Sequence, residues 1–385
     1  MIKIIYALAG AIAFLGIGCT EQSALVLEGS VEGVEGNQIY LYTVKNESYQ
    51  VYEVLDSATI QDGHFRLERK ELHPELYFLG KSDGQKATGG LVFLEPGKIK
   101  AIGKVDAKDQ FAWTVEGSVN QELYASFNAE NYSKTGQQQL DSLDELFFAA
   151  REKEDREEMA RVKEASLPLY YCADSLTQVL ARQYVNENKD KAFGLYLYKR
   201  YLFPREEYND TLSIHNAVDY VQSFGEEAHH TAYYDYLINR LNRLDRCAIG
   251  RVAPEVAGLD TLGNPMKLSD FRGKYVLVDF WNSYCHWCRE ESPNMRRALA
   301  ECGDNFTILG VSNDSKKELW MDAIHTDQAY WNHVLIDRVA SDALYNTYCI
   351  TGIPHIILVN PDGVIVAKEV RGEDIINVPK KFIGI

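Results

Sequence analysis

Two cysteines stand two residues apart in the stretch WNSYCHWCREESP, residues 281–293. Such a pair can bind a metal, form a structural disulfide or exchange electrons as a dithiol. A closed zinc site needs four ligands, and the sequence has no second CxxC pair, which makes a metal site a poor interpretation. A structural bridge across so short a loop adds little stability. The pattern therefore favours thiol–disulfide exchange.

The elements predicted around the pair make its two sulfurs unequal. The apolar run VLVDFW, residues 276–281, predicts a strand, and REESPNMRRALAEC, residues 289–302, predicts an amphipathic helix. Cys285 falls where the strand gives way to the helix, and unpaired N–H groups and the helix dipole there favour a thiolate. Cys288, one turn later and more buried, is positioned to attack a mixed disulfide formed at Cys285.

Residues 249–385 continue with alternating strand and helix patterns. FTILGVSND, IPHIILVN and GVIVAKEV are typical of strands, while SKKELWMDAIHTD is typical of a helix. This alternation predicts an α/β sheet that contains parallel strands, with function at the carboxyl ends of those strands.

The segment VLVDFWNSYCHWCREESP resembles the active site of the thioredoxin superfamily, specifically the membrane-anchored TlpA-like, AhpC/TSA-type thioredoxins of Gram-negative bacteria. The resemblance implies a thioredoxin fold for residues 249–385 and an exchange reaction that needs no bound cofactor. Asp279 stands where thioredoxins keep a buried carboxylate that accepts a proton from the resolving thiol. The alternative is a core carboxylate held by hydrogen bonds. Pro293 matches the proline that kinks the active-site helix.

The stretch Thr351-Gly352-Ile353-Pro354 resembles the loop whose cis-proline packs beside the disulfide in this superfamily. The resemblance implies a cis bond before Pro354 and backbone hydrogen bonds from Ile353 to an extended substrate. A trans proline at the start of a strand is the alternative. His355 follows and is a candidate to influence the thiolate.

Three residues around the cysteines depart from the usual thioredoxin pattern. His286 and Trp287 replace the Gly-Pro dipeptide, and Tyr284 replaces the usual Trp. A histidine beside the nucleophile can stabilise the thiolate and make the disulfide a stronger oxidant. Together with Ile353, these residues are predicted to contact substrate.

Two further regions precede the thioredoxin-like domain. Residues 19–119 contain short apolar runs separated by turns, which predict an antiparallel β domain of sandwich type. Residues 120–248 have apolar residues at three- and four-residue steps and predict a region of four or five helices, with breaks near Pro204 and Gly225. LDSATIQDGHFRL and FLEPGKI resemble a β domain of unknown function that precedes such thioredoxins in Bacteroidetes lipoproteins.

The amino terminus reads as a lipoprotein signal peptide, residues 1–18. Lys3 precedes an apolar run that is short for a membrane span, and Leu15-Gly16-Ile17-Gly18-Cys19 resembles a lipobox with Cys19 as the lipidated residue. Ordinary cleavage near Gly18 is the alternative. We therefore expect a protein of the cell envelope, anchored to a membrane by lipid and facing the periplasm. A net charge of −16 disfavours nucleic acid as a partner.

These features predict a thiol–disulfide oxidoreductase that reduces or reshuffles disulfides in exported proteins, with apocytochrome c among the candidate substrates. A membrane redox donor would supply its electrons. One alternative is an AhpC/TSA-type peroxidase, although the upstream proline of that pattern is missing before Ser283. The other is a binding or scaffold lipoprotein. Cys302 and Cys349 are expected to be buried small side chains. A bridge between Cys172 and Cys247 stays open.

Overall fold

The computed structural model describes residues 24–385 apart from 33–37, 47–50, 83–86, 106–110 and 206–207. The predicted signal peptide and Cys19 lie outside the described residues. The chain divides into two compact units, residues 1–128 and 129–385, and each is described by itself. The helical region and the α/β region share the second unit, and the finer predicted domain boundaries stay a prediction. Within the described ranges, no helix is long and apolar enough to cross a membrane.

Two four-stranded sheets make up most of the first unit. Apolar side chains from both sheets fill one core, and buried residues alternate with more exposed ones along β1 and β4. Leu25 and Leu27 of one sheet and Ile39 and Leu41 of the other are fully buried in it. In spatial order the strands are β4 (His64–Arg69), β1 (Leu25–Glu32), β7 (Gly97–Val105) and β8 (Phe111–Glu116), then β3 (Val51–Thr59), β2 (Gln38–Asn46), β5 (Glu75–Ser82) and β6 (Ala87–Leu94).

One strand pair departs from the antiparallel pattern predicted for this domain. β1 and β7 run parallel, with Leu25 opposite Gly97. A parallel pair needs a long connection between its strands. Here the chain between β1 and β7 supplies it by forming β4 and the whole second sheet, which local sequence patterns cannot reveal.

The second unit begins with helices. The break predicted near Gly225 falls between α5 and α6, whereas Pro204 lies in a short 3-10 helix, Phe203–Arg205, which follows α4 and a π-helical turn, Tyr198–Leu202. The described residues of this region form seven α-helices where four or five were predicted, because α4 and α6 are short. Asp155, Asp210 and Thr231 cap the amino termini of α3, α5 and α7. The helices are α1 (Val119–Lys134), which begins in the first unit, α2 (Gln137–Glu152), α3 (Arg156–Glu187), α4 (Ala192–Leu197), α5 (Thr211–Gln222), α6 (Glu226–His229) and α7 (Ala232–Arg246).

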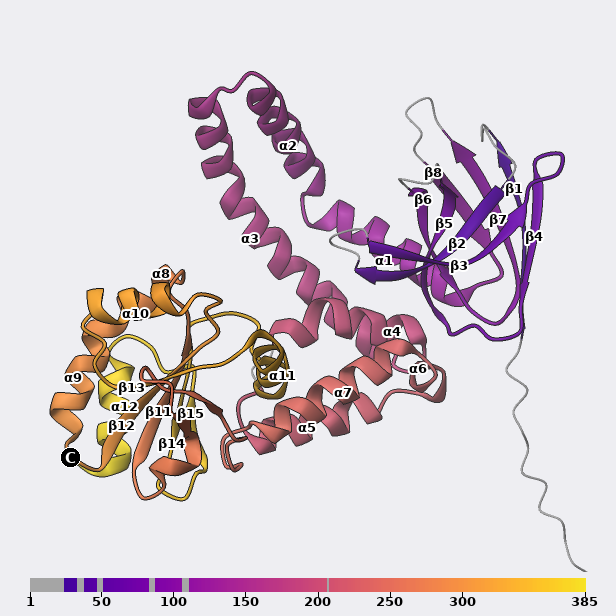
Figure 1. Ribbon diagram of the computed structural model, residues 1–385. Helices are drawn as coiled ribbons and strands as arrows, with labels where there is room; N and C mark the ends of the chain where they lie inside the picture. The colour runs from indigo at the N-terminus through magenta and orange to yellow at the C-terminus, as the bar shows by residue number, and fades with distance from the viewer. Residues whose placement is uncertain (1–23, 33–37, 47–50, 83–86, 106–110, 206–207) are drawn as a thin grey trace, which may run out of the picture. The chain divides into compact units, whose positions relative to one another are not determined.

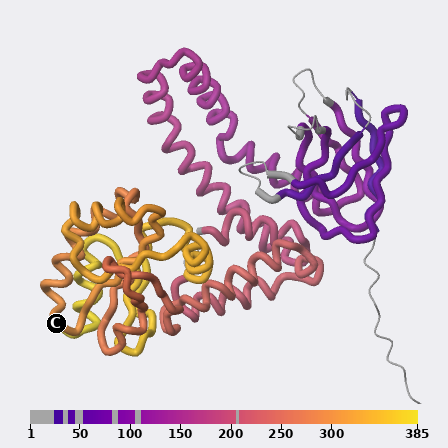
Figure 2. Tube along the Cα trace, viewed as in Figure 1, coloured from indigo at the N-terminus to yellow at the C-terminus, as the bar shows by residue number. Residues whose placement is uncertain are grey.

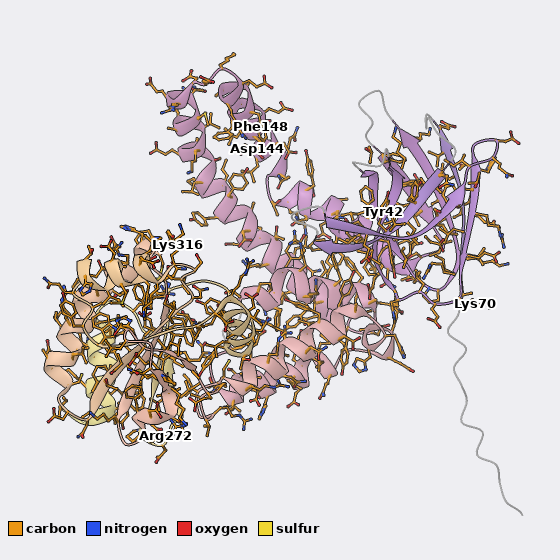
Figure 3. All side chains as sticks on the ribbon, viewed as in Figure 1. Tyr42, Lys70, Asp144, Phe148, Arg272 and Lys316 are labelled. Atoms are coloured by element: carbon orange, nitrogen blue, oxygen red, sulfur yellow. A yellow bond between two sulfur atoms is a disulfide. The ribbon has the colours of Figure 1, made fainter. Side chains whose placement is uncertain are left out.

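Helices α2 and α3 form a hairpin, visible in the chain trace of Figure 2. Tyr170 of α3 donates a hydrogen bond of 2.6 Å to Asp144 of α2. Phe148, labelled beside Asp144 in Figure 3, is 56% exposed.

A seven-stranded sheet with helices on both faces completes the second unit (Figure 1). Its spatial order is β10 (Pro265–Lys267), β9 (Ala257–Leu259), β13 (Asn332–Leu335), β12 (Phe306–Ser312), β11 (Tyr275–Trp281), β14 (His355–Val359) and β15 (Ile365–Lys368). The helices are α8 (His286–Glu290), α9 (Ser292–Cys302), α10 (Lys317–Thr326), α11 (Arg338–Tyr348) and α12 (Asp374–Ile383).

Strand β11 is central and positions the cysteine pair. It runs parallel to β12 and antiparallel to β14, and its residues from Val276 to Trp281 are buried because both sheet faces are covered. Leu277 packs with α9 and α12 on one face, while Phe280 packs with Tyr348 of α11 on the other. The predicted order of β, helical and α/β regions is confirmed.

Candidate active site

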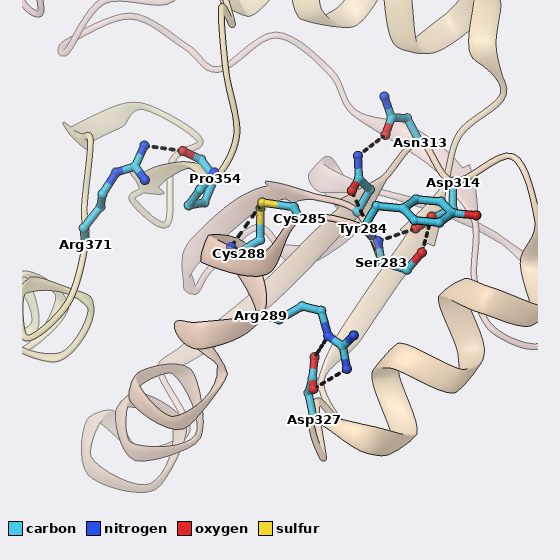
Figure 4. Close-up of a disulfide and its surroundings, with 11 residues drawn as sticks. Ser283, Tyr284, Cys285, Cys288, Arg289, Asn313, Asp314, Asp327, Pro354 and Arg371 are labelled. Carbon is cyan, nitrogen blue, oxygen red and sulfur yellow. Dashed lines mark hydrogen bonds and ion pairs between the residues drawn. A yellow bond between two sulfur atoms is a disulfide. The ribbon is translucent and has the colours of Figure 1, made fainter. Parts of the chain in front are cut away.

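The loop after β11 carries Cys285 and Cys288, which are joined in a disulfide (Figure 4). Cys285 is the residue before α8, and its sulfur accepts a hydrogen bond of 3.1 Å from the backbone N–H of Cys288. Cys288 is buried, with 3% of its surface exposed, whereas Cys285 is partly exposed. An incoming thiolate can therefore reach the Cys285 sulfur, while Cys288 is suited to intramolecular attack.

Two short helices replace the single predicted helix after the cysteines. α8 ends at Glu290, and α9 restarts at Ser292 with Pro293 in its first turn. Proline lacks a backbone N–H, so it fits a first turn but not a helix interior. Pro293 therefore marks a break in the helix at the position where the sequence predicted a kink.

The second half of the site comes from the loop before β14. The Ile353–Pro354 peptide bond is cis. His355 pairs with Phe280 of β11, so this loop lies at the same edge of the sheet as the cysteine loop. Ile353 and Cys285 both pack against a buried cluster that contains Trp281 and Cys288. Pro354 has no N–H to offer, and backbone hydrogen bonds from Ile353 to a substrate stay a prediction.

Asp279 lies within β11, two residues before the strand ends at Trp281. It is 3% exposed, and its Oδ1 has no hydrogen-bond partner among the described residues. Burial, reinforced by the nearby Glu291 carboxylate, raises the pKa of Asp279 to about 8, although Arg371 opposes this shift. A carboxyl group with that pKa can accept and return a proton near neutral pH.

Glu291 and Arg371 belong to this site but were not found from the sequence. Glu291 follows α8 and accepts a hydrogen bond of 3.1 Å from the backbone N–H of Gly372. Arg371 donates a hydrogen bond to the Pro354 carbonyl oxygen (Figure 4). Arg371 thus links the cis-proline loop to the electrostatic environment of Asp279. No local motif marks either residue, because their partners are distant in the sequence.

Replacing Arg371 with glutamine should raise the pKa of Asp279 further, since a cation that lowers it is removed. Loss of the hydrogen bond to Pro354 should also slow disulfide exchange about tenfold. The measurement is the pH profile of disulfide reduction. Arg297→Gln is the control, because its ion pair with Glu373 is exposed. Equal pH profiles of disulfide reduction for the two variants would contradict a role for Arg371 in the active site.

The three side chains that depart from the thioredoxin pattern lie around the disulfide with different exposures and partners. Trp287 is 69% exposed and Tyr284 is 67% exposed, so two aromatic surfaces are available to a substrate chain. The His286 Nε2 lies 3.1 Å from Glu290 Oε1, one turn along the helix. His355, the other candidate, has its Nδ1 3.1 Å from Glu369 Oε1. The influence of either histidine on the thiolate stays a prediction.

A buried carboxylate anchors the amino-terminal side of the cysteine loop and was also missed from the sequence. Asp314, 6% exposed, accepts hydrogen bonds from the Ser283 hydroxyl at 2.6 Å and the Ser283 backbone N–H at 2.9 Å (Figure 4). Ser312 donates a third bond of 2.7 Å. On the other side, Arg289 of α8 forms two hydrogen bonds to Asp327. These contacts tie both ends of the cysteine loop to neighbouring segments.

The remaining described cysteines are unbridged. Cys172 is exposed and Cys247 is buried, so the bridge left open between them is absent. Cys302 is buried as expected, whereas Cys349 is only partly buried. Across the part of the chain that the structure describes, no group of three or more His, Cys, Asp or Glu residues is placed to hold a metal ion.

A central strand that leads into a CxxC loop, with a cis-proline loop beside it and a buried carboxylate in the strand, defines the thioredoxin class. The AhpC/TSA family model matches residues 249–368, and a domain of unknown function, DUF4369, matches residues 25–124. The thiol-disulfide oxidoreductase ResA of Bacillus cereus is 30% identical over 150 residues, which cover 37% of this chain and 79% of ResA. The thioredoxin-like protein YneN of Bacillus subtilis is 30% identical over 30% of this chain and 68% of its own length.

Among solved structures, the thioredoxin domain of a thiol-disulfide oxidoreductase from Bacteroides vulgatus is 50% identical. The match covers 35% of this chain and 98% of that domain, with a TM-score of 0.35. The match to ResA is 30% identical and spans 79% of ResA. The chain therefore belongs to the family of thioredoxin-fold thiol-disulfide oxidoreductases.

Proposed function

We propose that this enzyme is anchored in the cell envelope by a lipid on Cys19, faces the periplasm, and reduces or reshuffles disulfides in exported proteins through Cys285 and Cys288. Apocytochrome c is a candidate substrate, and a membrane redox donor regenerates the dithiol. The exposed aromatic surfaces of Tyr284 and Trp287 support a protein substrate, since aromatic side chains are enriched where proteins bind one another.

The observation that carries the proposal is the asymmetry of the cysteine pair. The Cys285 sulfur is reachable and accepts a backbone hydrogen bond, while Cys288 is buried directly behind it. In the reducing direction, the Cys285 thiolate attacks a substrate disulfide and releases one substrate thiolate. Cys288 then gives its proton to the Asp279 carboxylate and attacks Cys285, which releases the second substrate thiolate.

Trapping tests this proposal directly. A Cys288→Ser variant of the full chain, expressed in its own envelope, should accumulate mixed disulfides between Cys285 and exported proteins because the resolving thiol is absent. Mass spectrometry of the non-reduced complexes identifies the substrates. The Cys285→Ser, Cys288→Ser double variant is the control. Equal capture by the single and double variants would contradict the proposal. Consumption of peroxide by the purified protein, with no disulfide reductase activity, would favour the peroxidase alternative.

The anchor makes a separate prediction. Cys19→Ser should move the protein from the membrane fraction to the released fraction, because no acyl chain can then be attached. Immunoblotting of fractionated cells measures this, with Cys172→Ser as the control. Retention of Cys19→Ser in the membrane fraction would contradict lipidation at this residue.

A further inference from the structure

Two helices that pack against each other are each followed directly by a cysteine. Cys247 follows the last residue of α7, in the helical region, and Cys349 follows the last residue of α11, beside the α/β sheet (Figure 1). Cys349 packs against the core cluster that contains Cys247, and the two thiols lie close enough for each to shift the pKa of the other. The pair is therefore formed by residues that are far apart in the sequence.

The two sulfurs differ in access to solvent. Cys247 is completely buried, whereas Cys349 lines a pocket of about 740 Å³. This volume is within the usual range for small-molecule sites. The pocket is lined both by the cis-proline loop, through Thr351, Gly352 and Ile353, and by the helical region, through Arg240 of α7. A small molecule in the pocket would meet Cys349 first.

Positive charges surround the pair. Lys368 Nζ lies 3.9 Å from the Cys247 sulfur, and Arg240, Lys368 and Arg371 line the pocket with Glu369 as the acidic residue. Both thiols lie at the carboxyl end of a helix, which is the negative end of the helix dipole. The two dipoles therefore oppose ionisation of the thiols. The interaction with the neighbouring Cys247 thiol, helped by the cations Arg240, Arg243 and Lys368, nevertheless lowers the pKa of Cys349. The same interaction, together with burial, raises the pKa of Cys247.

We propose that Cys349 and Cys247 are a second redox-active thiol pair whose oxidant is an anionic low-molecular-weight disulfide of the glutathione disulfide type. The Cys349 thiolate attacks one sulfur of that disulfide, forming a mixed disulfide and releasing the first small thiolate. Cys247 then gives its proton to the released small thiolate and attacks the Cys349 sulfur, releasing the second small thiolate, which takes a proton from water. One disulfide is reduced to two thiols, and the two cysteines are oxidised to one disulfide.

The product joins the end of α7 to the end of α11, two residues before Thr351 of the cis-proline loop. Cys285 and Cys288 take no part in these steps. The pair can therefore be tested without the first site, and the two proposals fail independently.

The experiment uses the full chain carrying Cys285→Ser and Cys288→Ser, reduced and then treated with glutathione disulfide. Proteolysis without reduction, followed by mass spectrometry, should yield one peptide pair linked through Cys247 and Cys349, with two equivalents of glutathione released. In the same protein, brief alkylation at neutral pH should label Cys349 about tenfold faster than Cys172, an exposed cysteine without a cysteine partner.

Adding Cys247→Ala should stop the reaction at a glutathione adduct on Cys349, and adding Cys349→Ser should leave Cys247 unmodified because it is buried. The linked peptide in the parent protein tests the pair even if the Cys247 variant fails to fold. The proposal is overturned if glutathione stays on Cys349 while Cys247 is present, or if Cys172 alone is modified.

Discussion

Cys285→Ser should lower the rate of insulin reduction by at least about 1,000-fold, because the reaction loses its nucleophile. The described structure makes this the largest expected effect of any single substitution. The buried Cys288 cannot replace Cys285, since 3% exposure prevents an external disulfide from reaching its sulfur. The rate of insulin precipitation in the presence of a dithiol measures the effect.

Two further variants separate the roles of the cysteines. Cys288→Ser should still react once with a disulfide but should not turn over, because its mixed disulfide has no intramolecular attacker. Cys302→Ser is the control, since Cys302 is a buried thiol at the end of α9, fourteen residues beyond Cys288. Insulin reduction by Cys285→Ser within a few-fold of the unmodified protein would contradict the assigned nucleophile.

Asp279→Asn should slow the resolving step roughly 100-fold near pH 8, because asparagine cannot accept the proton of Cys288. In the unmodified protein, the fraction of ionised Asp279 grows as pH rises through its pKa of about 8. The rate of resolution should therefore rise between pH 7 and pH 9 and lose this dependence in the variant. Rapid-mixing measurements of the mixed disulfide, made at several pH values, report the step. An unchanged pH profile would assign Asp279 a purely structural role.

The same substitution should change stability in a pH-dependent direction. The folded pKa of Asp279 is raised above its unfolded value, so the unmodified protein loses stability as pH rises from the unfolded pKa through about 8. The asparagine side chain of the variant is neutral throughout. Asp279→Asn should therefore match the unmodified protein near pH 4 and exceed it by roughly 5 kcal/mol near pH 8.5.

Urea unfolding at the two pH values measures the difference. The matched control is Asp260→Asn, because turn hydrogen bonds led by the Asn264 backbone lower the pKa of Asp260 instead. That depressed pKa contributes stability above the unfolded pKa, which is lost as pH falls through the folded pKa, so this variant should not gain stability at pH 8.5. Destabilisation of Asp279→Asn at pH 8.5 would contradict an unpaired buried carboxylate.

Features set by local sequence were the ones that could be predicted. The run VLVDFW has no polar interruption except Asp279, which is typical of a strand covered on both faces, and β11 is such a strand. The two cysteines and Pro293 lie within nine residues, so their order along strand, loop and helix is visible directly. The cis-proline loop was recognised from four consecutive residues.

Features set by contacts between distant segments could not be predicted. Arg371 reaches Pro354, and Asp314 holds Ser283, but neither residue has a signature in its own segment. Strands β9 and β10 have three residues each, which is too short to show the alternation of apolar and polar residues that predicts a strand. The pair of Cys247 with Cys349 likewise depends on packing of α7 against α11, which no local pattern specifies.

Site-resolved alkylation of the reduced full chain tests the central claim most directly, namely that Cys285 is the reactive sulfur and Cys288 the protected one. Iodoacetamide is applied briefly at pH values from 5 to 9, and mass spectrometry gives the rate at each cysteine. Near pH 7 we expect Cys285 to react about tenfold faster than the exposed Cys172, and Cys288 to react more slowly than Cys172. Equal rates at Cys285 and Cys172 across this range, or faster labelling of Cys288 than of Cys285, would contradict it.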